Sequence, residues 1–209
     1  MNRRILYIGM SLCVAVVLLY DTTWASEWKR VTWVDDGDTV VLSDGVRVRY
    51  IGVNAPEVAH EGRPAERFGP EARAFNGKLV FQKKVRLELD REEQDQYNRL
   101  LAYVFLEDGT FVNAELVRGG YAYCLFQRPN TKYDGQLLGL QKEAMKKRAG
   151  LWQGFVDQEG PYVGNRHSKR FHGASCPFGK KISPKNRIFL KTRHDAFWKG
   201  FSPCKRCKP

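Results

Sequence analysis

The chain has 209 residues, of which 43% are hydrophobic and 28% are charged, and its formal net charge is +12. This apolar share is ordinary for a folded protein and argues against an intrinsically disordered chain, and the length allows one medium domain plus a small one. Residues 160–209 hold 13 Lys or Arg and a single acid, Asp195, so the excess positive charge lies in the C-terminal quarter. A basic segment of this kind indicates a polyanionic partner.

Residues 1–25 have the pattern of an export signal. Arg3 and Arg4 form a short positive region, an uncharged and largely apolar run follows, and Ala25 offers a small residue for cleavage. The apolar run, residues 5–20, is shorter than the ~20 residues of a membrane-spanning helix. We therefore expect cleavage after Ala25 and a periplasmic or extracellular protein without a stable membrane span. An uncleaved N-terminal anchor is the alternative.

The next part of the chain is predicted to be a β-hairpin region that gathers several charged side chains. Residues 36–38, Asp-Gly-Asp, favour a tight turn, and the alternation that follows places Arg47 and Arg49 on one strand face. Carboxylates such as Asp38 bind hard cations, a guanidinium binds phosphoryl oxygens, and a carboxylate such as Glu57 can act as a general base. These residue types together are typical of a site that hydrolyses phosphodiester bonds. The alternative is a solvated hairpin with scattered surface charge.

Helix and strand patterns continue to about residue 152. Gly69-Pro70-Glu71 has the features of a helix start, because proline is favoured in the first turn and an acid near the positive helix end. A polar segment at 59–69 is expected to be a loop beside the site, and the glycines and proline of 154–165 favour a domain boundary. The remaining predicted elements are helices at 112–118 and 135–149 and strands at 27–35, 39–42, 46–52, 84–89 and 99–106.

A second arginine-bearing segment follows at residues 95–103, which are Asp-Gln-Tyr-Asn-Arg-Leu-Leu-Ala-Tyr. The chain thus holds three blocks in order: Asp-Gly-Asp-Thr, an arginine followed eight residues later by the glutamate of a Pro-Glu turn, and Asp-x-Tyr-x-Arg-x-Leu-Ala-Tyr. In these blocks and their spacing, residues 27–152 resemble the staphylococcal nuclease, or thermonuclease-like, family. The resemblance implies an α+β, mainly β fold, with an OB-type five-stranded β-barrel and three helices.

The resemblance also implies roles for individual residues. Asp38 would be a calcium ligand, with Asn54 in place of the family's second acidic ligand and Ala55 contributing a main-chain carbonyl. An asparagine keeps an oxygen but removes a charge, so we expect weakened calcium binding. Two arginines would clamp the scissile phosphate and a glutamate would be the general base. These predicted catalytic residues are Arg49, Arg99 and Glu57.

Three aromatic residues are candidate contacts to the substrate. By the same resemblance, Tyr97 would lie beside the bound nucleotide. The aromatic-rich run at 121–126 has two interpretations. Core packing is the usual one, and stacking of Tyr123 or Phe126 on a nucleobase is the other.

The basic C-terminal segment holds four residues of metal-ligand type, His172, Cys176, Cys204 and Cys207. Their spacing suits a closed tetrahedral zinc site. A segment this short cannot bury much core, so we expect a bound metal ion or disulfides to stabilise it. The pattern resembles the metal-binding domain of the Ada methyl-phosphotriester repair protein, with His172 where that family has its methyl-accepting cysteine. The alternative is that the tail cysteines and Cys124 form disulfides after export.

We therefore expect a signal at 1–25, a nuclease domain at 26–155, a linker at 156–165 and a small zinc-stapled α/β domain at 166–209. The expected function is that of an exported, monomeric, calcium-dependent nuclease that cleaves the 5′ P–O bond of DNA or RNA and leaves 3′-phosphates. A catalytically silent OB-fold nucleic-acid-binding protein is the alternative, and the presence of both arginines and the glutamate favours the enzyme. Since these groups precede the basic tail, a chain ending near Gly154 is expected to retain turnover.

Overall fold

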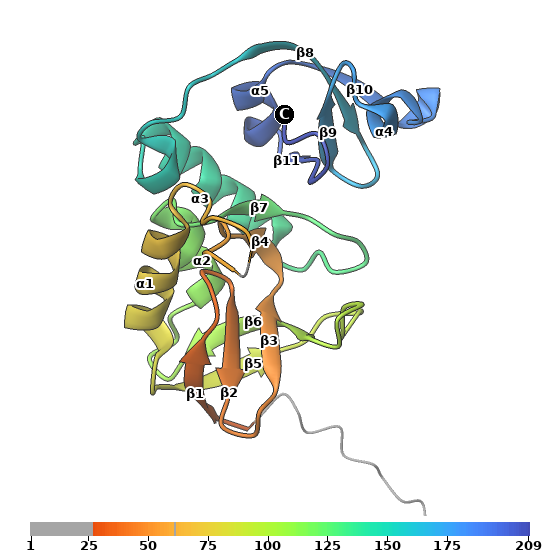
Figure 1. The fold of residues 1–209 in the computed structure, drawn as a ribbon. Helices are drawn as coiled ribbons and strands as arrows, with labels where there is room; N and C mark the ends of the chain where they lie inside the picture. Colours follow the sequence, from red (N-terminus) through yellow and green to blue (C-terminus); the bar gives the residue numbers. More distant parts are fainter. Residues whose placement is uncertain (1–26, 61) are drawn as a thin grey trace, which may run out of the picture.

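The computed structural model describes residues 27–60 and 62–209. The predicted export signal at 1–25 lies outside these residues. Among the residues described, no helix combines the length and the apolar character needed to cross a membrane. Two folded parts follow one another along the chain, a β-barrel with three helices and a smaller module built on a sheet, and Figure 1 shows them stacked one on the other.

A closed barrel of five strands forms the first part, in the order β1-β2-β3-β6-β5. Neighbouring strands are antiparallel except for β3 and β6, which are parallel. Valines that alternate along the strands, such as Val31, Val40 and Val48, are fully buried in the core, as a period-2 pattern predicts. The predicted five-stranded barrel is confirmed. Its strands are β1 (Lys29–Val34), β2 (Thr39–Leu42), β3 (Arg47–Tyr50), β5 (Lys84–Glu88) and β6 (Leu100–Leu106).

Helices α1 and α2 pack on the barrel and on each other, and α3 packs on the other side of α2 and on β7 (Tyr123–Leu125). The first helix starts as predicted, with a proline in its first turn and Glu71 near its positive end. The helices are α1 (Gly69–Val80), α2 (Val112–Arg118) and α3 (Asp134–Lys146).

The strand predicted at 46–52 is in fact two strands with different partners. β3 ends early, and β4 (Gly52–Asn54) pairs instead with β7 (Tyr123–Leu125). Gly52 permits the change of direction, because its φ of +79° is unfavourable for other residues and an added Cβ would lie 2.6 Å from a leucine of α3. As a result, Asn54 lies opposite Tyr123.

A four-stranded sheet in the order β10-β8-β9-β11 forms the second part. The range 156–165, predicted to be a linker, includes the whole of β8. Gly160 and Pro161 interrupt its apolar pattern, but Tyr162 is buried and β8 pairs with two other strands. The elements are β8 (Glu159–Asn165), β9 (Arg170–Gly173), β10 (Arg187–Thr192), β11 (Ser202–Pro203), α4 (Pro177–Lys180) and α5 (Arg193–Trp198), with 3₁₀ turns at Gly150–Trp152 and Pro184–Asn186.

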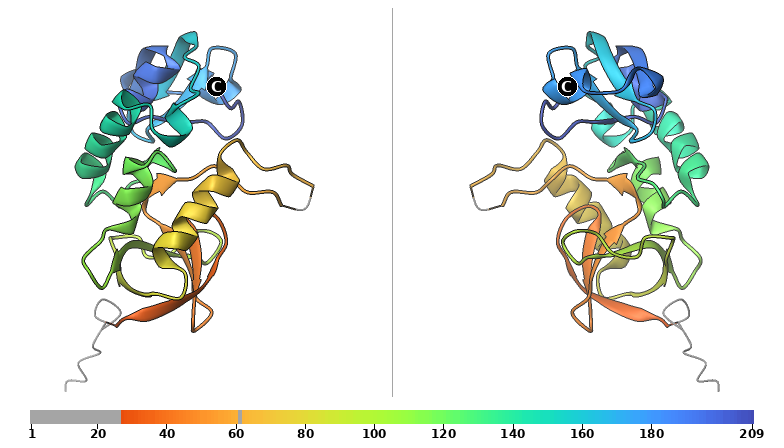
Figure 2. Two further views of the ribbon diagram at one scale, coloured as in Figure 1. Left: turned by 90° about the vertical axis from the view of Figure 1, so that its left-hand side faces the viewer. Right: turned by 90° about the vertical axis from the view of Figure 1, so that its right-hand side faces the viewer.

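The two parts share one apolar core. Gln141 of α3 is fully buried, accepts the backbone N–H of Cys124 at 2.6 Å and donates to the carbonyl of Phe197 in the second part at 2.6 Å. The rings of Trp152 and Phe197 meet edge to face with their centroids 5.1 Å apart. In both views of Figure 2, α3 runs along the C-terminal module. The shared cluster consists of Ala144, Met145, Trp152, Tyr162, Phe171, Leu190, Ala196, Phe197 and Phe201.

Candidate active site

A buried ion pair lies where the barrel meets β4 and β7. Arg49 Nη2 is 2.9 Å from Asp38 Oδ2, and both residues are less than a tenth exposed. The same Asp38 oxygen accepts the backbone N–H of Ala55 at 2.7 Å, and the other accepts the hydroxyl of Thr39 at 3.1 Å. Gly37 permits this close approach, because a Cβ there would lie 2.5 Å from the Cβ of Ala55. The Asp-Gly-Asp turn therefore needs its glycine for packing.

Asn54 connects this ion pair to β7. Its Oδ1 accepts a hydrogen bond from Arg49 Nη2 at 3.2 Å. Its Nδ2 donates to the carbonyl of Ala55 at 3.0 Å and to the hydroxyl of Tyr123 at 3.1 Å. The three residues predicted to bind calcium thus lie in one cluster around Arg49. We call Asp38, Arg49, Asn54 and Ala55 the arginine cluster.

Burial dominates the electrostatics of this cluster. It raises the pKa of Asp38 to about 7, although the Arg49 guanidinium acts in the opposite direction. It also raises the pKa of Tyr123 to about 12, so this hydroxyl is neutral at physiological pH. The oxygens of Asp38, Asn54 and Ala55 are of the type that a hard cation prefers, but only one of them belongs to a carboxylate. The donor set fits a weakly bound divalent cation, provided that Arg49 releases the oxygens it now contacts.

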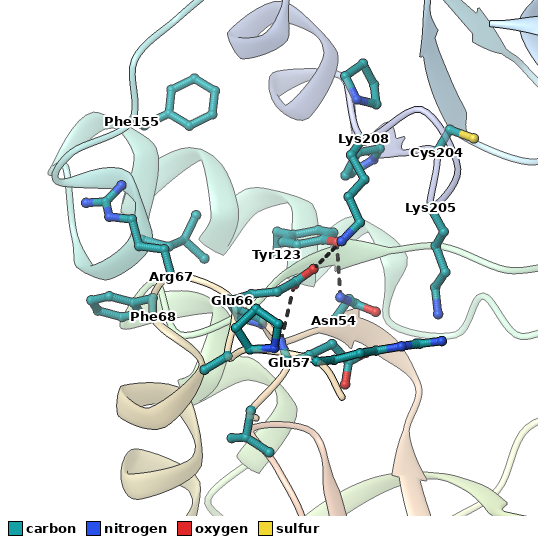
Figure 3. Close-up of a pocket in the computed structure, with 18 of the residues that line it drawn as sticks. Asn54, Glu57, Glu66, Arg67, Phe68, Tyr123, Phe155, Cys204, Lys205 and Lys208 are labelled. Carbon is teal, nitrogen blue, oxygen red and sulfur yellow. Dashed lines mark hydrogen bonds and ion pairs between the residues drawn. The ribbon is translucent and has the colours of Figure 1, made fainter. Parts of the chain in front are cut away.

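Glu57 follows the arginine cluster and lines a cleft of about 790 Å³. It is exposed, and its backbone N–H donates to Glu66 Oε2 at 3.3 Å. In Figure 3, Asn54, Glu57 and Tyr123 lie together, and Lys205 and Lys208 extend toward them from the second part of the chain. The cleft is thus bounded by both parts.

Arg99 and Tyr97 form a separate group just before β6. Arg99 pairs with Asp95, whose Oδ2 lies 2.7 Å from Nη2 and 2.8 Å from Nε, and its guanidinium lies 5.5 Å from the centroid of the Tyr97 ring. Although partial burial acts to raise it, hydrogen bonds from Arg99 hold the pKa of Asp95 below its ordinary range. Among the residues described, Arg99 makes no hydrogen bond to the arginine cluster. Arg49 and Arg99, the two arginines predicted to bind the scissile phosphate, therefore belong to separate groups of hydrogen-bonded residues.

The two aromatic candidates of β7 and its C-terminal end differ in their surroundings. Tyr123 is partly exposed, lines the cleft and meets Phe197 edge to face at 5.5 Å. Phe126 is only 7% exposed and belongs to the barrel core. For Phe126 the structure thus favours core packing, the first of the two interpretations, because other side chains cover its ring.

The predicted zinc ligands come together in the second part. One ligand atom from each of His172, Cys176, Cys204 and Cys207 lies within 4.8 Å of all the others, and Cys176 Sγ is 3.4 Å from His172 Nδ1. Tetrahedral zinc with Zn–S bonds of about 2.3 Å needs sulfurs about 3.8 Å apart, so the cluster fits the ion. The four cysteines of the described chain are free thiols, and Cys124 is buried in the barrel core, away from this cluster.

Three charged residues that line the cleft, Glu66, Lys205 and Lys208, are not among the site residues predicted from the sequence. Glu66 accepts the backbone N–H of Glu57 with Oε2 and pairs with Lys208 Nζ through Oε1 at 3.0 Å. Lys205 and Lys208 could have been noticed because each directly follows a predicted zinc ligand. Glu66 carries no such signal, since its partner Lys208 is 142 residues away in the chain.

The barrel, the arginine cluster and the Cys/His module together define an OB-fold protein with a cleft suited to an anionic ligand. A family model described as "Staphylococcal nuclease homologue" matches residues 47–154, and one described as "Metal binding domain of Ada" matches residues 158–209. The chain belongs to the staphylococcal nuclease family, and its second part is an Ada-type metal-binding domain.

Individual relatives agree with this membership. The thermonuclease of Staphylococcus intermedius is 43% identical over 123 residues, which cover 57% of this chain and 73% of that protein. The thermonuclease of Staphylococcus hyicus is 40% identical over 126 residues, covering 59% and 74%. Endonuclease YncB of Bacillus subtilis (strain 168) is 36% identical over 132 residues, covering 60% and 62%.

Proposed function

We propose that this protein is a nuclease that hydrolyses phosphodiester bonds of DNA or RNA. The observation that carries the proposal is the buried guanidinium of Arg49, held between Asp38 and Asn54 beside a cleft that Glu57 lines. A guanidinium can bind a phosphate at two points, and an exposed carboxylate beside it can activate water. Relatives named thermonuclease and endonuclease support the same activity.

In the proposed reaction, Arg49 exchanges its contact with Asp38 for the scissile phosphate. Glu57 accepts a proton from water, whose oxygen bonds to phosphorus while the bond from phosphorus to the 5′ oxygen breaks. The departing 5′ oxygen takes up a proton from solvent, so the products are a 3′-phosphate and a 5′-hydroxyl. Arg99 leaves its ion pair and stabilises the charge that develops on the phosphate, and the exposed Tyr97 lies beside a neighbouring nucleotide.

Asp38, Asn54 and the carbonyl of Ala55 would hold a calcium ion, which would supply positive charge near the phosphate. Binding is weak because Asp38 is the one carboxylate of this set and already faces the Arg49 guanidinium. The released guanidinium leaves Asp38 ready to bind a cation, so substrate and calcium are expected to favour each other's binding.

The Cys/His cluster would hold a zinc ion with a structural role, because four protein ligands leave no open position for water. We further propose that the protein is exported, acts as a monomer outside the cytoplasm, and consists of a nuclease domain at 26–155 and a metal-binding domain that begins with β8. The charge distribution supports a nucleic-acid partner, since the basic excess lies in the second domain.

A nuclease assay on purified protein tests the proposed function. The substrates are single-stranded DNA, double-stranded DNA and RNA, each with calcium, with magnesium or with a chelator. We expect cleavage that requires calcium, leaves 3′-phosphate ends and is lost in Glu57→Gln. Tight binding of nucleic acid without cleavage under any of these conditions would favour the alternative, a catalytically silent binding protein.

A further inference from the structure

The metal-binding domain forms one wall of the proposed nuclease cleft. Asn54 and Glu57 line the barrel side, and residues of the C-terminal segment, 203–209, line the opposite side. In Figure 3, Lys208 extends from this segment to a position above Asn54, and Lys205 extends downward at the side of Asn54. A substrate strand bound at Glu57 therefore lies between two protein surfaces, of which only one belongs to the barrel.

Hydrogen bonds and packing hold the C-terminal segment in place. The backbone N–H of Cys204 donates to the carbonyl of Phe171 at 2.9 Å, and Arg170 Nη1 donates to the carbonyl of Pro203 at 3.1 Å. Phe171 is fully buried in the core that both domains share. This wall is consequently fixed relative to the barrel, in contrast to a basic tail on a flexible linker.

Lys205 and Lys208 are the cationic side chains that the C-terminal segment presents to the cleft. Lys208 pairs with Glu66, but the two side chains are 72% and 42% exposed, so the pair is weak and exchangeable. In the described part of the chain, Lys205 forms no ion pair with a carboxylate. Each lysine directly follows a cysteine of the zinc cluster, so zinc would fix the backbone from which it extends.

We propose that Lys205 and Lys208 bind phosphates of the strand that is being cut, on nucleotides next to the scissile phosphate held by Arg49. This proposal rests on the proposed nuclease function and adds a substrate-binding subsite supplied by the metal-binding domain. Ammonium groups contact phosphate oxygens without reading the bases, so the subsite strengthens binding without sequence preference. Arg193 of α5 also lines the cleft, and the basic residues of the domain that lie outside the cleft act on the substrate only at longer range.

Binding measured apart from cleavage tests this subsite. The protein carries Glu57→Gln, is loaded with zinc and receives no calcium. The probe is a fluorescent single-stranded oligodeoxynucleotide of about a dozen nucleotides, whose dissociation constant is measured by anisotropy at several salt concentrations. Lys205→Gln is compared with Lys185→Gln, which removes the same charge from an exposed position of the same domain outside the cleft. Zinc content and melting temperature confirm that each variant is folded.

We expect Lys205→Gln to raise the dissociation constant about tenfold, the effect of losing one charge-assisted phosphate contact. The slope of log affinity against log salt should become shallower by about 0.7, the value for one contact to a single strand. Lys208→Gln should have a smaller effect because its ammonium first has to leave Glu66, and Lys185→Gln should change little. A dinucleotide probe without terminal phosphates has a single phosphate, which cannot contact Arg49 and Lys205 at once, so it should lose the difference between Lys205→Gln and Lys185→Gln.

Equal dissociation constants and equal salt slopes for Lys205→Gln and Lys185→Gln would overturn the subsite. The readout needs no turnover, so it can be obtained even from a protein without nuclease activity. Failure of the subsite and failure of the proposed nuclease function are thus distinguishable. If Lys205→Gln weakens binding but the protein with Glu57 intact cleaves no nucleic acid, the subsite is a nucleic-acid contact and the nuclease function is excluded.

Discussion

The barrel and the metal-binding domain are stabilised in different ways. The buried cluster of the barrel is built from residues 31–140, all of them within its own strands, helices and connections. The second domain instead buries Phe171, Phe197 and Phe201 against Met145 and Trp152 of the first. A domain of its length can bury little core alone, so it depends on a neighbour and on the Cys/His cluster. The basic C-terminal part is therefore folded against the barrel domain and is not a flexible tail.

The same two regions differ in charge. Residues 160–209 carry as many net positive charges as the whole chain, so the rest of the chain is neutral overall. The groups proposed for chemistry lie in the neutral region, and cationic groups lie on the opposite wall of the same cleft. The proposed catalytic groups and most of the excess positive charge therefore lie in different domains. Mutations can consequently change turnover and substrate binding separately.

The largest expected effect is on turnover and is confined to the barrel. Glu57→Gln should lower kcat roughly 10²–10⁴-fold through loss of the general base. Arg49→Lys and Arg99→Lys should have effects of similar size, since lysine cannot replace a guanidinium bound at two points. Single-turnover kinetics on single-stranded DNA measure this loss, while zinc content should stay unchanged.

Arg47→Lys is the matched control for Arg49→Lys. Arg47 is two residues away on the same strand face, but it is exposed and pairs with Asp35. We expect nearly normal kcat in this variant. Nearly normal kcat in Glu57→Gln, Arg49→Lys or Arg99→Lys would remove the residue concerned from its catalytic role.

The next effect concerns the shared core. Phe197→Ala should lower the free energy of unfolding by about 3–5 kcal/mol, because a buried ring that touches both domains leaves a cavity. Phe189→Ala is the control, since Phe189 lies in the same domain but is 73% exposed. Urea unfolding monitored by circular dichroism gives both values. A cost for Phe197→Ala as small as that for Phe189→Ala would mean that the shared core contributes little.

The shared core also changes the expectation for a shortened chain. A protein ending near Gly154 is predicted from the sequence to retain turnover, because the catalytic groups precede that residue. In the structure, such a chain would expose Met145 and Trp152, and Gln141 would lose its hydrogen bond to Phe197. We now expect this truncated protein to be much less stable than the full chain.

A smaller effect is expected at the proposed calcium ligands. Asn54→Asp adds a second carboxylate to the set, so the calcium concentration that gives half-maximal activity should fall by about tenfold, since affinity rises with ligand charge. Isothermal titration with calcium alone should show the same direction. An unchanged calcium dependence together with unchanged binding would exclude Asn54 from the ligand set.

Much of the candidate site could be predicted from the sequence because the informative residues are close together in the chain. The Asp-Gly-Asp turn, Arg49 and the zinc ligands belong to short blocks with defined spacing, and the structure brings each block together. The division of the strand at Gly52 is a local feature that the apolar alternation conceals. It becomes visible only through the pairing of β4 with β7.

What could not be predicted depends on contacts between distant segments. The aromatic-rich run leaves open whether Phe126 packs in the core or contacts a nucleobase, and only the packing of the barrel core shows that its ring is covered. The second wall of the cleft depends on the shared core, which also brings Lys208 close to Glu66, and no periodicity reveals this arrangement. The Gly-Pro pair in β8 is typical of a loop in the sequence, but in the structure this segment is a strand that pairs with β9 and β10.

We expect the two domains to unfold as one cooperative unit, stabilised by the shared core and by zinc bound at the Cys/His cluster. Differential scanning calorimetry of the full chain and of Cys204→Ser tests it most directly, with zinc measured by elemental analysis. We expect about one equivalent of zinc and a single transition in the full chain. In Cys204→Ser, zinc should be lost and the whole transition should move to lower temperature. Two separate transitions, with the barrel melting at the same temperature in both proteins, would contradict the account.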